Sequence, residues 1–196
     1  TRDKTIKSAA DVLTLTDLPV LASIPLANKK QQAGLPFATH RDPEGMYADG
    51  YHKVRSSIEF VSFEKDVKTI LVTSPNASEG KSTTSSNLAL ALSSVGKRTV
   101  LLDVDFRRAR VHQIYGVPQN PGLSDVILHG VDMSSVAYAV QEPGLTDLLV
   151  VPTGSTPPSP AAFVGTSGFL SNLEWMKSQA DVIVMDAPPL LAVSDA

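Results

Sequence analysis

The chain has 196 residues, a net charge of −3 at pH 7, and 42% hydrophobic and 19% charged residues. This length allows one α/β domain with a filled core, and the absence of a basic excess gives no reason to expect a nucleic-acid partner. Cysteine is absent, which excludes disulfides, iron–sulfur clusters and thiol catalysis, and no apolar run is long enough for a membrane span.

Residues 1–45 are expected to form an arm and a linker in front of the main domain. Ser8 is a typical N-cap for a short helix that begins there. Residues 18–25 lie between two prolines, which favours an edge strand or a docking arm. Residues 27–45 are polar and carry glycine and proline, so they are interpreted as the linker.

Residues 46–196 are predicted to form the main domain, a mainly parallel sheet flanked by helices. Residues 46–63 have apolar side chains at helical spacing, and continuous aliphatic runs then alternate with helical segments, which is typical of buried parallel strands. The predicted strands are 68–72, 97–105, 145–151 and 181–186, and the predicted helices are 82–95, 106–115, 122–129, 134–140 and 160–179.

Residues 73–83, TSPNASEGKST, stand between a predicted strand and a predicted helix and match half of the phosphate-loop pattern G-x-x-x-x-G-K-[ST]. Pro75 occupies the first glycine position, whereas Gly80, Lys81 and Ser82 are in place. A helix that starts here offers unpaired N–H groups to a phosphate; Lys81 can reach the β- and γ-phosphates, and the Ser82 hydroxyl is placed to bind Mg²⁺. The alternative, a polar loop with a chance lysine, is disfavoured by this strand–loop–helix context.

Asp103, Asp105 and Asp186 fall at the ends of predicted strands, where parallel α/β sheets bind their ligands. Asp103 and Asp105 are two residues apart on one predicted strand, so we expect their side chains to leave the same face and converge on one ion. A single aspartate at a strand end is more often a cap or turn former. Three of them beside a phosphate loop predict a Mg²⁺ site that they share.

The segments TSPNASEGKST, VLLDVDFRR and VIVMDAPP resemble the Walker A, A′ and B motifs of the bacterial tyrosine kinases (BY-kinases), which control capsular and exopolysaccharide export. The resemblance covers essentially the whole chain and implies an α/β P-loop NTPase fold of the MinD/ParA type. It also implies a protein-tyrosine kinase that transfers the γ-phosphate of Mg-ATP to tyrosines in the C-terminal tail of a neighbouring subunit.

The resemblance also implies roles for individual residues. Asp103 would take the proton of the tyrosine, with Lys81 and Asp105 as the other catalytic residues, because a phenol is a poor nucleophile at neutral pH without a base. Ser82, Asp105 and Asp186 would hold the metal. Arg107 is a candidate for phosphate or acidic-substrate contact, with a structural ion pair as the alternative. The expected nucleotide-binding residues are Ser78, Glu79, Gly80, Lys81, Ser82, Thr83 and Arg107.

The sequence departs from the family at several positions. Ala77 and Ser78 replace a proline and a glycine, so Ser78 must adopt the backbone conformation that glycine would supply. The E-x-x-R-x-x-R motif, which helps assemble a ring of subunits, is matched only at Arg55. The expected partners are ATP/ADP, further copies of the chain, and a membrane chain-length-regulator domain in the same or a partner chain. We expect the chain to be a C-terminally truncated piece of a protein that works on the cytoplasmic side of the plasma membrane.

Two other functions stay open. A non-kinase switch ATPase of the septum-placement or partition class shares the fold, but Asn76 stands where that class has a signature lysine. A regulatory nucleotide-binding module without turnover is the third hypothesis, because the phosphate loop is altered.

Overall fold

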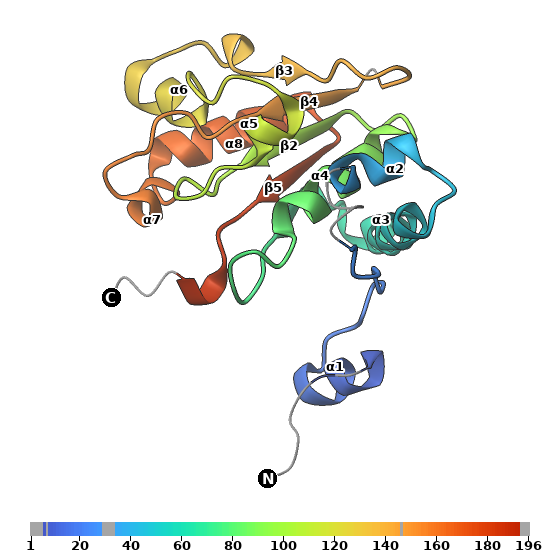
Figure 1. Cartoon of the computed structure of the whole chain (residues 1–196). Helices are drawn as coiled ribbons and strands as arrows, with labels where there is room; N and C mark the ends of the chain where they lie inside the picture. The colour runs from blue at the N-terminus through green and yellow to red at the C-terminus, as the bar shows by residue number, and fades with distance from the viewer. Residues whose placement is uncertain (1–5, 7, 29–33, 146, 193–196) are drawn as a thin grey trace.

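The computed structural model describes residues 6, 8–28, 34–145 and 147–192. Its centre is a five-stranded sheet of order β1-β5-β2-β4-β3, in which the first four strands are parallel and β3 runs antiparallel to β4 (Figure 1). The register pairs Asp186 with both Val72 and Asp103, so the strands β1, β5 and β2 end level at one edge. The strands are β1 (Thr69–Val72), β2 (Thr99–Asp103), β3 (Tyr138–Ala139), β4 (Leu148–Val151) and β5 (Val182–Asp186).

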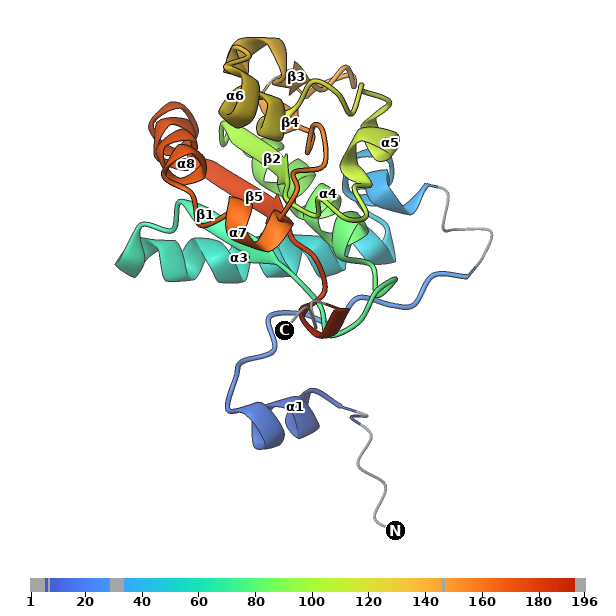
Figure 2. The ribbon, with the colours of Figure 1, turned by 90° about the vertical axis from the view of Figure 1, so that its left-hand side faces the viewer.

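Helices cover both faces of the sheet, as Figures 1 and 2 show from two sides. Alternate residues of β2 divide between two cores: Leu101 packs with the α4 side, and Val100 and Leu102 pack with the α8 side. These aliphatic side chains are almost completely buried, which explains why the strand has a continuous apolar sequence. The helices around the sheet are α2 (Ala38–Arg41), α3 (Met46–Lys65), α4 (Lys81–Ser93), α5 (Val111–Tyr115), α6 (Leu123–His129), α7 (Pro160–Phe163) and α8 (Ser167–Gln179).

The predicted strands of the main domain are confirmed within a few residues, and three predicted helices differ. The helix expected over 106–115 begins only at Val111, because side-chain carboxylates hold the preceding turn. The helix expected over 134–140 is a 3₁₀ turn, η2 (Met133–Ser135), followed by β3, which pairs with β4. The helix expected over 160–179 is broken between α7 and α8.

The arm in front of the domain contains the helix α1 (Ala9–Thr16), capped by Ser8 as predicted. This helix buries no residue and lies apart from the body of the molecule (Figures 1 and 2). The strand expected over 18–25 does not form; this stretch approaches α3, where a Cβ on Gly50 would come within 3.0 Å of the Ile24 side chain. Residues 1–5, 7 and 29–33 of the predicted arm and linker lie outside the described residues.

The second half of the predicted linker belongs to the core instead. Residues 34–41 form the 3₁₀ turn η1 (Leu35–Phe37) and α2, which pack on α4. The amide of Asn87 in α4 fixes them: its Oδ1 accepts the Thr39 N–H and hydroxyl at 2.9 Å, and its Nδ2 donates to the Leu35 carbonyl at 2.7 Å. The linker interpretation is therefore wrong for residues 34–41.

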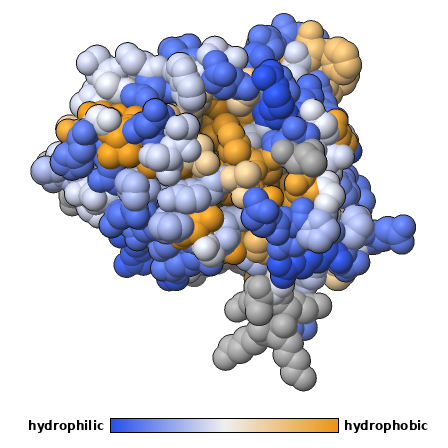
Figure 3. Space-filling view, turned by 90° about the horizontal axis from the view of Figure 1, so that it is seen from above, coloured by the Kyte–Doolittle hydropathy of each residue, from blue (hydrophilic) through white to orange (hydrophobic). Residues whose placement is uncertain are grey.

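The surface seen from above is mostly hydrophilic, with apolar side chains gathered in a hollow near its centre (Figure 3). None of the helices in the described ranges combines the length and the apolar composition that a membrane crossing needs.

Candidate active site

The phosphate loop joins β1 to α4 and ends in an open helix start. Gly80 is left-handed, with φ 86°, and no side chain caps the helix that begins at Lys81. The first N–H groups of α4, which lack partners within the helix, and the positive end of its dipole are therefore available to a phosphate. Ser78 is also left-handed, with φ 64°, so it adopts the conformation predicted from the altered loop sequence.

Glu79 closes the loop on itself. Its carboxylate accepts hydrogen bonds from the Asn76 N–H at 3.0 Å and from the Asn76 side-chain amide at 3.1 Å. The hydrogen bond from the Asn76 backbone N–H is the largest of the effects that lower the pKa of Glu79 below its ordinary value. The Glu79 side chain is thus hydrogen-bonded within the loop.

The end of β1 and the first residues of the loop are hydrogen-bonded to the segment that follows β5 and includes the 3₁₀ turn η3 (Leu190–Ala192). One side-chain contact and three backbone contacts join the two segments. They run from Ala187 N to Val72 O (3.0 Å), Thr73 Oγ1 to Pro188 O (2.8 Å), Leu190 N to Ser74 O (2.8 Å) and Leu191 N to Pro75 O (3.0 Å).

Asp186, at the end of β5, is 1% exposed and faces the start of α4. Burial raises the pKa of its carboxyl to about 6, and the hydroxyls of Ser82 and Ser85 and the Lys81 ammonium oppose that rise. Its Oδ1 is buried without a hydrogen-bond partner among the described residues. A buried, unpartnered carboxylate oxygen beside a serine hydroxyl fits a hard divalent cation or one of its waters.

Asp105 lines the same cavity as Lys81 and Ser82 and is 6% exposed. It lies two residues beyond the end of β2, not within a strand as predicted, because the chain turns at this point. Its Oδ1 accepts the Arg108 N–H at 3.0 Å, which fixes the carboxylate at the mouth of the turn.

Asp103, the last residue of β2, is completely buried. Both carboxylate oxygens accept backbone N–H groups at 3.1 Å: Oδ1 from Asp105, and Oδ2 from Arg110 and Val111. Burial, with the nearby Asp186 charge adding to it, raises the pKa of Asp103 to about 7, against the effect of these three donors.

The three aspartates do not share one ion as predicted. Asp103, Asp105 and Asp186 meet at one sheet edge, but within the described ranges no three acidic, histidine or cysteine side chains gather as a metal site. The reason is that backbone N–H groups of the segment 105–111 take both oxygens of Asp103. Ser82, Asp105 and Asp186 remain the candidate metal ligands.

The cavity in front of the loop has a volume of about 840 Å³. Of the predicted nucleotide-binding residues, Ser78, Gly80, Lys81, Ser82 and Thr83 line it. Sequence reasoning missed the opposite wall, which comes from η1 and from the segment that includes α5. The sequence RRAR at 107–110 places two further arginines after Arg107, but the geometry of the turn decides which of these side chains face the cavity. The missed residues are Pro36, Phe37, Arg108, Arg110, Gln113, Ile114 and Pro189.

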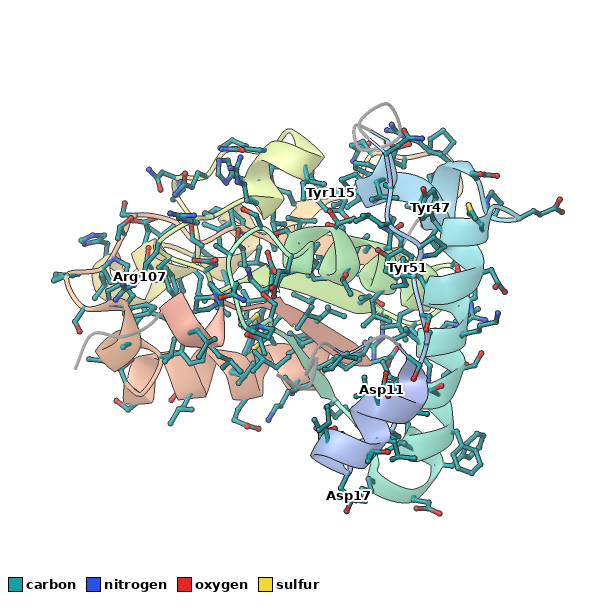
Figure 4. The ribbon with its side chains drawn as sticks, turned by 60° about the horizontal axis from the view of Figure 1, so that its bottom comes forward. Asp11, Asp17, Tyr47, Tyr51, Arg107 and Tyr115 are labelled. Atoms are coloured by element: carbon teal, nitrogen blue, oxygen red, sulfur yellow. The ribbon has the colours of Figure 1, made fainter. Side chains whose placement is uncertain are left out.

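Arg107 does not line this cavity. It borders a separate apolar cavity of about 410 Å³, with Phe106 and Leu190 among its neighbours. Figure 4 shows Arg107 on the α7–α8 side of the molecule, away from Tyr115 and the α2 side. The nucleotide-binding role predicted for Arg107 therefore has no support from its position, and Arg108 and Arg110 stand where it was expected.

Comparisons with known proteins agree on the fold. The model of the ParA family, described as NUBPL iron-transfer P-loop NTPase, matches residues 66–195. The solved structure of the chimerical protein CapA2B2 superposes with a TM-score of 0.86 at 27% identity, over 96% of this chain and 78% of that chain. The kinase domain of the Escherichia coli tyrosine kinase ETK, at 24% identity, shares the fold with a TM-score of 0.85, over 96% of this chain and 75% of that chain.

The curated relatives are tyrosine-protein kinases. The chain is 32% identical to the putative tyrosine-protein kinase CapB of Staphylococcus aureus over 86% of this chain and 72% of CapB. It is 35% identical to the tyrosine-protein kinase YwqD of Bacillus subtilis over 79% of this chain and 64% of YwqD. It spans about a quarter of longer relatives, such as Ptk of Acinetobacter johnsonii, of which it covers 27%. The phosphate loop, the two aspartate strands and these matches together show that the chain belongs to the bacterial tyrosine kinases, a branch of the ParA-type P-loop NTPases.

Proposed function

We propose that this chain binds Mg-ATP at the start of α4 and transfers the γ-phosphoryl group to a tyrosine hydroxyl. The observation that carries the proposal is the open helix start at Gly80–Lys81, which faces a cavity that Asp105 also lines and that has the unpartnered oxygen of Asp186 beside it. The names of the relatives support a tyrosine as the acceptor.

In the proposed reaction, the phenolic oxygen forms a bond to the γ-phosphorus while the bond between that phosphorus and the β,γ-bridging oxygen breaks, and ADP leaves with the electron pair. The backbone N–H groups at 80–83 hold the phosphates, and the Lys81 ammonium offsets the charge that moves to the leaving group. Ser78 and Glu79 contribute their backbone N–H groups to the same cradle.

Ser82, Asp105 and Asp186 would hold the magnesium ion. When bound, this ion neutralises phosphate charge and orients the β- and γ-oxygens. The two carboxylates differ in their hydrogen bonds: Asp105 Oδ1 accepts the Arg108 N–H, whereas Asp186 Oδ1 has no donor among the described residues. We infer that Asp186 has the more open coordination position.

We also propose Asp103 as the group that accepts the tyrosine proton. A carboxyl with a pKa near 7 is suited to take and release a proton at neutral pH. Its two oxygens hold backbone N–H groups of the turn that Arg108 and Arg110 border, so a proton that arrives there would weaken at least one of those bonds. Phosphoryl transfer would therefore be coupled to a movement of the segment 105–111.

The test is phosphotyrosine formation by the chain with Mg-ATP and a supplied tyrosine peptide, measured by mass spectrometry. Lys81→Met is expected to abolish the product, and Lys177→Met, a change of the same kind on α8, is expected to leave it. Release of inorganic phosphate without phosphotyrosine would instead favour the switch ATPase, and nucleotide binding without either product would favour the regulatory module.

Asp103→Asn tests the base separately. We expect loss of phosphotyrosine with retained nucleotide binding by calorimetry. Because an asparagine amide would face the Arg110 and Val111 N–H groups, the thermal unfolding midpoint of the variant must be measured beside it. Unchanged phosphorylation would eliminate Asp103 as the base.

One relative is named a putative tyrosine-protein kinase in cps region of Klebsiella pneumoniae, and this chain spans 21% of it. That name supports a role for this chain in capsular or exopolysaccharide synthesis and export. We propose that this chain acts in such a pathway at the cytoplasmic face of the membrane, as a homo-oligomer and together with a membrane chain-length regulator.

A further inference from the structure

The wall of the active-site cavity opposite the phosphate loop has its own chemistry. Arg108 and Arg110 border it, and Pro36, Phe37 and Ile114 add an apolar surface. Both arginines are exposed, and neither forms an ion pair with a carboxylate in the part of the chain that the structure describes.

This wall is fixed by the protein. The Arg110 N–H is bonded to the buried Asp103 carboxylate, and its guanidinium donates to Gln113 Oε1 at 2.9 Å. The Phe37 ring packs edge-on against Tyr115 at 5.1 Å, and Arg41 lies over it at 4.4 Å. The Asn87 amide anchors the turn that carries Phe37. A surface held from three elements is suited to recognise a partner rather than to adapt to solvent.

The topology decides which substrate meets this wall. The phosphate loop follows β1, and Arg108, Arg110 and Ile114 follow β2, with β5 and Asp186 between them. A nucleotide whose phosphates lie on the start of α4 has its γ-phosphate near Asp105 and Asp186, so the loop is on the leaving-group side. In-line attack requires the acceptor to approach from the far side of the γ-phosphorus. Arg108 and Arg110 follow Asp105 along the chain, on the β2 side of the loop, so we place the acceptor on that side.

Resting on the proposed kinase function, we propose that this wall selects the acceptor: Pro36 and Ile114, backed by the buried Phe37, receive the tyrosine ring, and Arg108 and Arg110 bind carboxylates next to that tyrosine. The favoured substrate is thus a tyrosine in an acidic peptide. Guanidinium groups pair with carboxylates through directed hydrogen bonds, and an apolar wall beside them fits the ring of the residue in between.

The experiment compares two peptides that differ only in charge, one with glutamates on both sides of a tyrosine and one with glutamines. We expect the chain with Mg-ATP to show a kcat/KM for the glutamate peptide that is roughly tenfold higher, because charge-assisted pairs at exposed positions contribute modestly to binding. In Arg110→Gln and in the Arg108→Gln, Arg110→Gln double variant this ratio should fall towards one, while Arg110→Lys should keep part of it. Lys177→Gln, which removes one positive charge on α8, is the matched control and should keep the full ratio.

Salt dependence in the unmodified chain gives a second measurement that needs no variant: the ratio should shrink between low and high salt, since exposed charge pairs are screened. Equal rates for both peptides, or a ratio that survives in the double variant, would overturn the inference and leave the kinase function intact. An Arg110→Gln effect on the KM for ATP as large as that on the peptide would also overturn it, because the arginine would then serve the nucleotide. Absence of phosphotyrosine on either peptide would contradict the proposed function itself.

Discussion

Replacing Asn87 with alanine tests whether the turn before the main domain is part of its core. The Asn87 amide is completely buried and makes four hydrogen bonds, two accepted from Thr39 and two donated to the carbonyls of Leu35 and Thr83. The variant would leave the buried Thr39 N–H and Leu35 carbonyl without partners. At about 1 kcal/mol net for each bond, we expect a loss of roughly 3–4 kcal/mol in the free energy of unfolding.

Such a loss is a large part of the stability of a domain, which is typically about 5–15 kcal/mol. Urea denaturation followed by circular dichroism measures it: with an m-value of about 2 kcal/mol/M, the midpoint should fall by roughly 1.5–2 M. Asn172→Ala is the matched control, because Asn172 makes one hydrogen bond, to Gly168, from a partly exposed position on α8. We expect that control to lose less than about 1 kcal/mol.

The double variant with Thr39→Ala separates the amide network from the general cost of a core substitution. If the two side chains act as one network, their effects should combine to clearly less than the sum. A loss below about 1 kcal/mol for Asn87→Ala, or strict additivity with Thr39→Ala, would refute the argument that this amide joins residues 35–39 to α4.

Substitutions at three other positions test contacts in the loops of the domain. Gly122→Ala should lose about 3 kcal/mol or more, measured by urea denaturation, because its Cβ would collide with the backbone nitrogen of Gly154. Arg98→Gln should lower the urea midpoint only slightly at pH 6, since the pair with Asp181 is partly exposed. Arg98 lowers the pKa of Asp181 to about 2, so the pair stabilises the fold fully above the unfolded pKa of about 4. The difference in urea midpoint between the variant and the unmodified chain should therefore shrink as the pH falls from about 4 towards 2. A difference that stays constant over this range would contradict the pairing. Ser78→Val should lose about 1–2 kcal/mol because a β-branched residue is strained at this left-handed position, whereas Ser78→Gly should lose nothing; equal losses would exclude a backbone cause.

The main sheet and the phosphate loop could be predicted because their signals are local. The aliphatic runs around Leu101 and Val184 and the EGKS sequence before α4 need no distant partner to be recognised. The segment 34–41 could not be predicted, since Phe37 is a single aromatic residue in a polar stretch. It is buried only because Tyr115 and α4 lie beside it.

The carboxylates show the same limit. The position of Asp103 and Asp105 at the end of an aliphatic run predicted that both lie at one sheet edge, but not that Asp103 would bind the backbone of its own turn. Because of those bonds, α5 begins only at Val111. The backbone geometry of the preceding turn then determines where each of its side chains points. As a result Arg110 and Arg107 face different cavities, although nothing in the sequence RRAR distinguishes them.

The hydrogen bonds between the loop 73–75 and the segment 187–191 have a mechanical consequence. They join the loop that carries Lys81 and Ser82 to the segment that follows Asp186, two of them between backbone groups and one from the Thr73 hydroxyl to the Pro188 carbonyl. If a bound nucleotide moves either the loop or the segment 187–191 inward, the other must move with it. Departure of the product should accordingly release both together, as one cooperative opening rather than two separate ones.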